Sequence, residues 1–204
     1  MAYAMSRSFL RLINDMFQQH INFAHTHWQR LLLSGDTAID ATCGNGHDTL
    51  FLAKLALTQS TGRLFAIDIQ ESAIQKTKTL LQQHLNDSLL QRIIFKHGCH
   101  SKFDSELSLN SIKLIVYNLG YLPGGNKQIT TQAQTTLQSI EHAMDLLMEG
   151  GLISITCYPG HNEGSIEQSE LLKLASKLDV KQWACSHHTW LRNQAPSVLF
   201  LKKI

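Results

Sequence analysis

The 204-residue sequence is poor in charged residues and has no long apolar run. Asp, Glu, Lys and Arg make up 17% of it, and the formal net charge is only +2, whereas roughly one quarter of the residues are charged in ordinary soluble domains. A strong overall attraction to nucleic acid is therefore not encoded in the total charge, although a local basic patch is compatible with it. No apolar run approaches the roughly 18–20 residues that cross a bilayer, so we expect no association with a membrane.

Paired cysteines and a secretory leader are also missing. The four cysteines (Cys43, Cys99, Cys157 and Cys185) are scattered and form no C-x-x-C pair. A domain of this size needs no disulfide to be stable. The first residues, Met1–Met5, are not a basic segment followed by an apolar one, which argues against a signal peptide. We therefore expect a reduced, cytoplasmic protein.

The N-terminal part of the sequence has the period of helices. Apolar residues between Phe9 and Phe17 recur at spacings of three and four, which predicts one helix. A second helix is expected over residues 21–33, with Gly35 as its C-terminal cap. The sequence leaves open whether these helices pack on the rest of the chain, pair with a second subunit in a homodimer or contact a partner.

From residue 35 onward, short apolar strands alternate with helices. The expected strands are 37–40, 63–68, 92–95, 113–117 and 152–156, and the expected helices are 48–57, 71–85, 131–148 and 165–177. Two β-like runs, 181–186 and 197–202, close the sequence with no clear helix between them, which predicts an antiparallel hairpin. We therefore expect a single α/β domain. Its Rossmann-like core, over residues 35–204, has a doubly wound and mostly parallel sheet, and residues 1–34 form a helical extension.

A glycine loop lies between the first expected strand and the helix that follows it. Gly44 and Gly46 allow a sharp turn and leave room for a ligand to approach the backbone. The start of the next helix offers free N–H groups to a polar ligand. Asp48 and Thr49, at that helix start, are expected either to cap the helix or to reach the ligand.

Two acidic residues favour one ligand class over another. Asp40 ends the first strand, and Asp68 ends the second, where an acid commonly holds the two hydroxyls of an adenosine ribose. A dinucleotide site would need a third small residue at position 49, which is Thr49, and an acid before the loop suits a cation better than a pyrophosphate. The pattern favours S-adenosylmethionine (SAM), with its sulfonium and ammonium groups, over a nicotinamide dinucleotide. An ordinary strand-to-helix turn with a capping Asp is the plain alternative.

A second loop follows the fourth strand and is expected at the same edge of the sheet. It resembles the Asn-Pro-Pro-Tyr loop of methyltransferases that modify exocyclic amines, with Asn118 and Tyr121 in place and Leu119 and Gly120 replacing the prolines. In such loops the amide oxygen and a backbone carbonyl accept hydrogen bonds from the amine, and the aromatic ring stacks on the base. Because a sulfonium is a good leaving group, in-line positioning of a neutral amine is expected to supply most of the rate. The alternative is a glycine-rich turn with no catalytic role.

These motifs together resemble a family long described as rRNA methylases, whose members are associated with tRNA 5-(aminomethyl)uridine methyltransferase activity. The resemblance covers about residues 23–203. It is carried by Asp40-Ala41-Thr42-Cys43-Gly44-Asn45-Gly46-His47-Asp48-Thr49-Leu50-Phe51-Leu52-Ala53, Ala66-Ile67-Asp68-Ile69-Gln70, Asn118-Leu119-Gly120-Tyr121-Leu122-Pro123-Gly124-Gly125, Tyr158-Pro159-Gly160-His161 and Asn193-Gln194-Ala195-Pro196.

The resemblance implies a class I SAM-dependent methyltransferase that acts on tRNA. The reaction would convert 5-aminomethyl-(2-thio)uridine at the wobble position to its 5-methylaminomethyl form, with the anticodon stem-loop as partner. Together with the loop analysis, it gives these expected contacts to SAM: Asp40, Thr42, Gly44, Asn45, Gly46, Asp48, Thr49, Asp68, Gln70, Cys99, His100 and Asn118. Lys127 stands where the family commonly has an acid and is expected to meet RNA phosphate.

Other polar residues are weighed against plainer roles. Tyr158 and His161 follow the fifth strand, and Arg192 lies between the last two runs, so with Gly120, Tyr121 and Lys127 they are the candidate substrate contacts. The tight segment His97–His100 has no second ligand pair, so no metal site is expected. The alternatives to a tRNA enzyme are a SAM-dependent methylase of rRNA or of a small molecule, and a SAM- or nucleotide-binding module without catalysis.

Overall fold

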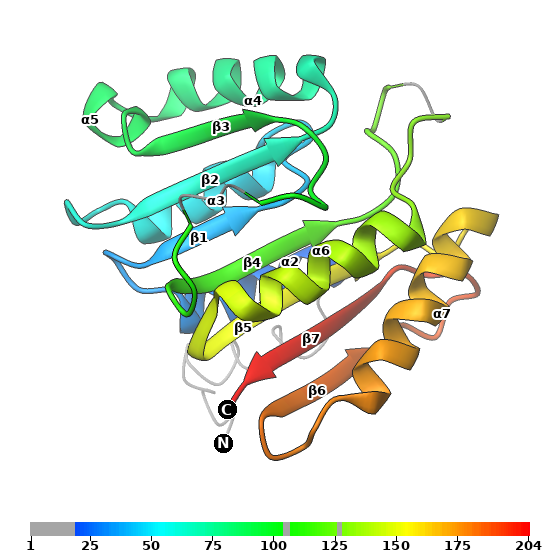
Figure 1. Cartoon of the computed structure of the whole chain (residues 1–204). Coiled ribbons are helices and arrows are strands. Elements are labelled where there is room, and N and C mark those ends of the chain that lie inside the picture. The colour runs from blue at the N-terminus through cyan, green and yellow to red at the C-terminus, as the bar shows by residue number, and fades with distance from the viewer. Residues whose placement is uncertain (1–18, 104–106, 126–127) are drawn as a thin grey trace, which may run out of the picture.

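The computed structural model describes residues 19–103, 107–125 and 128–204 and is built on a seven-stranded sheet (Figure 1). The strand order is β3-β2-β1-β4-β5-β7-β6. The strands are β1 (Thr37–Asp40), β2 (Arg63–Asp68), β3 (Ile93–His97), β4 (Ile112–Asn118), β5 (Leu147–Cys157), β6 (Trp183–His188) and β7 (Ser197–Lys203). The first five strands pair in parallel, whereas β7 is antiparallel to both β5 and β6. The predicted sheet and its terminal hairpin are confirmed.

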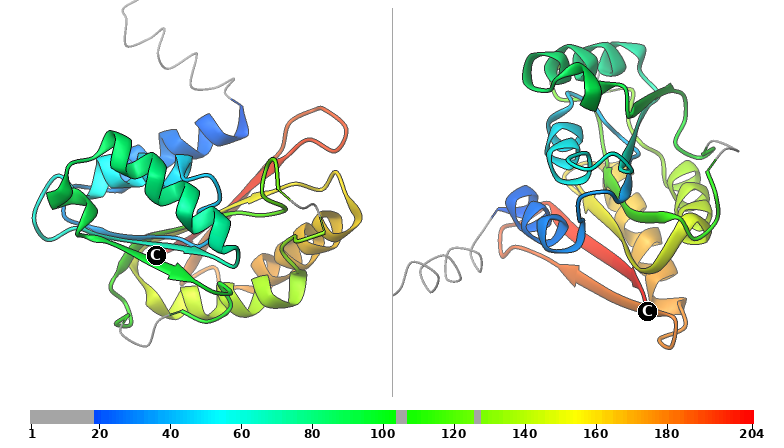
Figure 2. Two further views of the ribbon diagram at one scale, coloured as in Figure 1. Left: turned by 90° about the horizontal axis from the view of Figure 1, so that it is seen from above. Right: turned by 90° about the vertical axis from the view of Figure 1, so that its left-hand side faces the viewer.

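Helices cover both faces of the sheet (Figure 2). They are α2 (His20–Leu31), α3 (His47–Ala56), α4 (Glu71–His84), α5 (Asp87–Leu90), α6 (Ala133–Leu146) and α7 (Asn162–Lys177). The left view of Figure 2 places α2, α3 and α4 on one face and α6 and α7 on the other. Each face has its own apolar cluster, because each helix turns one apolar stripe to the strands. None of the helices in the described ranges is long and apolar enough to cross a bilayer.

The element bounds differ from the sequence expectations in a few places. α2 ends at Leu31, and Gly35 is not its cap: Gly35 (φ +98°) lies in the turn before β1 and donates its N–H to the Ala56 carbonyl at 2.8 Å. β5 begins at Leu147, inside the segment expected to end a helix. The four-residue α5 is too short to give a periodic signal. The helix expected between Phe9 and Phe17 lies outside the described residues.

The carboxyl ends of β1, β2 and β4 meet at one edge of the sheet, where the strand order reverses. β1 pairs with β2 on one side and with β4 on the other. Parallel α/β sheets bind ligands at such a point, because the loops after the strands diverge there and leave a crevice. The glycine loop and the loop after β4 are in contact at this edge, where Asn45 Nδ2 donates to the Pro123 carbonyl at 3.4 Å. The topology thus places both predicted loops side by side.

Candidate active site

The glycine loop needs both of its glycines for steric reasons. Gly44 (φ +53°) and Gly46 (φ +87°) adopt left-handed backbone conformations that other L-residues rarely take. A Cβ on Gly46 would also lie 2.9 Å from Thr77 Cα, so the loop packs directly against α4. The Thr77 hydroxyl donates to the Gly44 carbonyl at 3.1 Å. Gly46 is the N-cap residue of α3, and no side-chain hydrogen bond caps the helix. Neither Asp48 nor Thr49 therefore has the capping role that the sequence left open.

Asp68 connects this loop to the end of β2. Its Oδ2 accepts the Gly44 N–H at 3.0 Å, and its Oδ1 accepts the Gln70 N–H at 2.8 Å. Each carboxylate oxygen has two acceptor sites, so each retains one for a ligand hydroxyl. Burial raises the pKa of Asp68, while the two backbone N–H groups act in the opposite direction. The geometry fits a carboxylate that accepts a pair of ribose hydroxyls, with Gln70 at the start of the next helix.

Asp40 and Thr49 lie buried beneath the glycine loop, and their expected contacts with SAM stay predictions. Asp40 is 1% exposed, and its Oδ2 accepts the Thr49 hydroxyl at 2.6 Å, while its Oδ1 faces the Thr42 N–H at 3.2 Å. Thr49 is fully buried. Burial, and secondarily the charge of Asp48, raises the pKa of Asp40 to about 7. These two side chains therefore hold the loop in shape from beneath.

His100 follows β3, and its expected contact with SAM stays a prediction. Its ring is buried edge-on against Tyr117, and its Nε2 lies 3.4 Å from the Thr136 hydroxyl on α6. Burial lowers the pKa of the imidazole to about 4, so it is neutral near pH 7. Its neighbour Cys99 is partly exposed after β3, and its Sγ accepts from the Ser101 hydroxyl at 3.1 Å. Cys99 is thus better placed than the His100 side chain to face a ligand.

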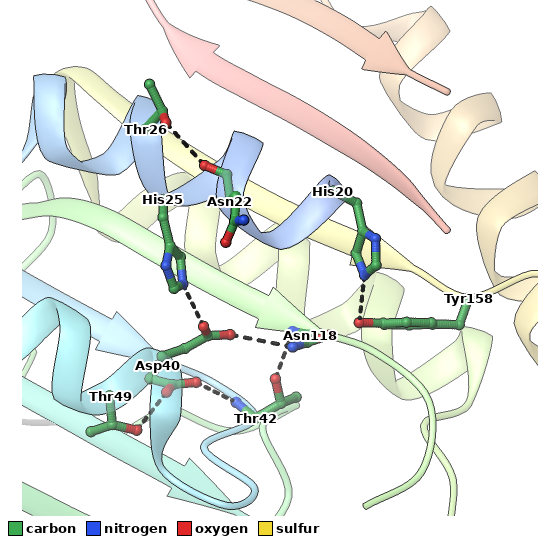
Figure 3. A network of polar contacts seen from close by, with 10 residues as sticks. His20, Asn22, His25, Thr26, Asp40, Thr42, Thr49, Asn118 and Tyr158 are labelled. Carbon is green, nitrogen blue, oxygen red and sulfur yellow. Dashed lines mark hydrogen bonds and ion pairs between the residues drawn. The ribbon is translucent and has the colours of Figure 1, made fainter. Parts of the chain in front are cut away.

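Asn118 ends β4 and joins the two loops through a chain of polar contacts (Figure 3). Its backbone N–H donates to the Thr42 hydroxyl at 2.7 Å, and its Nδ2 donates to Asp48 Oδ2 at 3.2 Å. Asp48 Oδ1 in turn lies 2.7 Å from His25 Nε2 on α2. The carboxamide predicted to orient an amine is therefore fixed on the glycine-loop side of the crevice.

The start of the loop after β4 is anchored to α7 by hydrogen bonds, in the absence of the prolines of the loops that it resembles. Gly120 (φ +107°) donates its N–H to the Thr131 hydroxyl at 2.8 Å, and that hydroxyl donates to Glu167 Oε2 at 2.8 Å. Glu167 is 2% exposed and also accepts the Thr136 hydroxyl at 2.5 Å. Burial raises the pKa of Glu167, and these hydroxyls act against that rise. A buried carboxylate on α7 thus anchors the stretch in which Leu119 and Gly120 replace the prolines.

The candidate substrate residues lie in several places, and the structure does not bring all of them together. Tyr121 is 39% exposed, and its ring centroid lies 6.0 Å from that of His161, whose Nδ1 accepts the Gly164 N–H and so caps α7. The Tyr158 hydroxyl lies 3.3 Å from His20 Nε2, and burial raises its pKa to about 12. Arg192 is exposed in the β6–β7 loop. Lys127 lies outside the described residues.

Sequence patterns did not predict that histidines of α2 and Glu167 of α7 belong to the site. His20 and His25 reach the site only because α2 docks on the face that carries α3, with Trp28 buried in the shared core. A histidine-rich segment over residues 20–27 is the one signal present in the sequence, and it does not indicate a target. No cluster of metal-ligating side chains occurs in the part of the chain that the structure describes.

The charges around the loop decide which ligand fits. Asp40, Asp48 and Asp68 lie around the glycine loop, and desolvation by burial raises the pKa of Asp40 and of Asp68. A pyrophosphate would add repulsion at this position, whereas a sulfonium and an ammonium group would neutralise the carboxylates. The residues present therefore fit SAM and do not fit a dinucleotide.

The strand order and the ligand edge are those of class I SAM-dependent methyltransferases, so the chain is an enzyme of that class. The family model described as "Putative rRNA methylase" matches residues 64–203, and the chain belongs to this family.

Relatives of known description agree with this family. A chloroplastic tRNA (mnm(5)s(2)U34)-methyltransferase of Arabidopsis thaliana is 37% identical over 211 residues, which cover 97% of this chain and 77% of the relative. A "putative rRNA-methylase" from Clostridium thermocellum is 33% identical with a TM-score of 0.86, over 92% of this chain and 99% of that one. A "putative methyltransferase" from Streptococcus mutans in complex with SAH is 30% identical with a TM-score of 0.80, over 93% of this chain and 100% of that one.

Proposed function

We propose that this chain transfers a methyl group from SAM to the amino group of 5-aminomethyl-(2-thio)uridine at the wobble position of tRNA. The product is the 5-methylaminomethyl form. The observation that carries the proposal is the Asn118 carboxamide, held at the end of β4 beside the glycine loop. The name of the Arabidopsis relative, 37% identical, supports the choice of acceptor.

SAM supplies an electrophilic methyl group on a positively charged sulfur. Asp68 would accept the ribose hydroxyls through its remaining acceptor sites, and Gln70 and Cys99, which follow β2 and β3, would contact the rest of the cofactor. The backbone of Gly44, Asn45 and Gly46 forms the floor of the loop. A positively charged ligand bound near Asp40 would favour its carboxylate form, because an opposite charge offsets the burial that raises its pKa.

The acceptor amine is oriented by Asn118. Because Asn118 Nδ2 donates to Asp48, the amide oxygen is the atom left to accept an N–H of the amine. Tyr121 is partly exposed near the start of the loop, where it bridges to Thr130, and its ring would stack on the uracil ring. The contribution of the protein is mainly to hold the amine lone pair in line with the methyl group, since well-oriented reactants need little further help. Gly120 belongs to the same surface, as do Tyr158 and His161.

The tRNA anticodon stem-loop is the proposed partner, with Arg192 and Lys127 as candidates for phosphate contact. A cytoplasmic compartment and a possible homodimer stay predictions. The Arabidopsis relative is described as chloroplastic.

Two measurements test the proposal. A calorimetric titration is expected to show SAM binding at micromolar levels and no comparable binding of NAD; the opposite result would exclude the SAM site. Mass spectrometry of tRNA nucleosides is then compared between cells with and without the gene. Loss of 5-methylaminomethyl uridines with accumulation of the aminomethyl precursor supports the proposal. Unchanged levels, in cells with no second enzyme for this mark, would leave methylation of rRNA or of a small molecule, or a binding module without catalysis.

A further inference from the structure

Helix α2 lies outside the strand–helix alternation, yet it contributes a side chain to the centre of the site. His25 Nε2 is 2.7 Å from Asp48 Oδ1, and the two side chains are only 20% and 12% exposed. The His25 ring is stacked on Phe51 with a centroid distance of 4.0 Å and an interplanar angle of 15°, and it lies 4.8 Å from the Trp28 ring. Trp28 is itself 1% exposed. The imidazole is therefore held in one place by packing as well as by its polar contact.

Asp48 divides its two oxygens between two partners. Oδ1 faces His25, and Oδ2 accepts from Asn118 Nδ2 at 3.2 Å. An ionised carboxylate can only accept hydrogen bonds, so the NH₂ group of Asn118 must face it. This settles the choice between the two amide orientations, which hydrogen-bond networks normally decide. The oxygen of Asn118 then points to the opposite side from Asp48.

We propose that His25 and Asp48 are a positioning pair, supplied in part by α2, that orients the Asn118 amide so that its oxygen faces the acceptor amine. The inference rests on the proposed role of Asn118 in methyl transfer. Figure 3 shows His25 and Asn118 joined through the carboxylate that lies between them. His25 donates Nε2–H to Asp48 Oδ1, and this contact fixes the rotamer of the carboxylate. Neither residue needs to touch the substrate for this effect.

The consequence is that helix α2 is part of the active site. When the His25 contact is lost, Asp48 is free to rotate, and the Asn118 amide is able to flip and present its NH₂ group to the amine. Two N–H donors would then face each other, and the lone pair of the amine would lose its alignment. Misplacement on the scale of an ångström is worth about 100-fold in rate. Binding of SAM through Asp68 and the loop backbone would be largely unaffected.

The test compares three variants on α2. In the tRNA methylation assay, His25→Ala is expected to lower kcat about 10- to 100-fold, with the KM for SAM changed by less than about 3-fold. His25→Gln keeps an N–H donor near Asp48 and is expected to recover most of the lost kcat. The matched control is Gln29→Ala, at an exposed position one turn further along the same helix, which is expected to match the wild type. An unchanged kcat in His25→Ala, or an equal loss in His25→Gln, would overturn the inference.

A second readout is independent of the tRNA reaction. The side-chain amide of Asn118 is followed by ¹⁵N NMR in the SAM-bound protein and assigned by its absence in Asn118→Ala. A single pair of protected N–H signals is expected in the wild type and in Gln29→Ala, with faster exchange or doubling in His25→Ala. Identical signals in His25→Ala would overturn the positioning role even in an active enzyme. If the wild-type chain failed to methylate tRNA, the proposed function would fail, while this measurement would still decide whether the pair orients Asn118.

Discussion

Replacing a glycine by alanine can destabilise a protein through backbone strain or through steric overlap of the new Cβ. Three glycines of this chain allow the two effects to be measured apart. Gly46 has both a left-handed conformation (φ +87°) and a blocked Cβ position, 2.9 Å from Thr77 Cα. Gly124 shares the left-handed conformation (φ +77°) but would place its Cβ in open space. Gly98 is not in the left-handed region and is also open. Alanine substitution at the three positions therefore tests the packing of the cofactor loop directly.

The expected losses follow from these geometries. Gly98→Ala is expected to leave the free energy of unfolding unchanged or to raise it by up to about 1 kcal/mol, because alanine restricts the unfolded chain. Gly124→Ala is expected to cost about 1–2 kcal/mol for the left-handed backbone. Gly46→Ala adds overpacking against Thr77 and is expected to cost about 2–5 kcal/mol.

The assay is equilibrium unfolding in urea, with SAM affinity measured by calorimetry on each folded variant. In Gly46→Ala the loop must move away from Thr77, which also shifts the Gly44 N–H away from Asp68, so SAM affinity is expected to fall with stability. Gly98→Ala serves as the control for substitution without strain. If Gly46→Ala were no less stable than Gly124→Ala, overlap of the new Cβ with Thr77 of α4 would not destabilise the protein, and the expected packing penalty at Gly46 would be wrong.

Two further substitutions test the electrostatics of the site. Asp68→Asn is expected to weaken SAM binding by about 10- to 100-fold, because hydrogen bonds to a charged acceptor contribute about 1.5–3 kcal/mol; an unchanged dissociation constant in calorimetry would exclude Asp68 as the ribose ligand. His100→Gln tests the buried imidazole, whose pKa falls from 6.5 to about 4 because of desolvation. As pH falls below 6.5 the unfolded state takes up the proton before the folded state does, so the wild type is expected to lose up to about 1.4 kcal/mol of stability per pH unit down to pH 4. Urea unfolding across this window should show a shallower loss in His100→Gln, and equal slopes would contradict the burial of a neutral His100.

Most of the fold was predictable from local periodicity, and the exceptions have physical causes. Strands with continuous apolar runs and helices with an apolar stripe are recognisable one by one, which is why β1, β2 and α4 fall close to their predicted bounds. The start of β5 was not predictable in this way. Leu147 and Met148 continue the apolar pattern of α6, and the helix ends there because Leu147 pairs with Ile112 of β4.

The candidate site was predictable as a location but not in its contacts. The order of the strands brings Asp68 and Asn118 to one edge, as the sequence indicated. Whether Asp40 faces a ligand or the interior depends on how β1 and α3 pack together, and no spacing rule encodes that. His25 reaches Asp48 across 23 residues through the docking of α2, which is a tertiary contact invisible to local patterns.

A methylation assay with the purified chain is the most direct test that it methylates the aminomethyl group of the wobble uridine. Transfer RNA from cells that lack the 5-methylaminomethyl mark is incubated with SAM and the full chain, and the nucleosides are analysed by mass spectrometry. We expect conversion of the aminomethyl nucleoside to its methylaminomethyl form. The conversion should depend on SAM and fall about 100-fold or more in Asn118→Ala, the scale of removing one positioning group. Absence of the methylated nucleoside with the wild-type chain would contradict the proposed function. Full turnover by Asn118→Ala would contradict the role of its carboxamide.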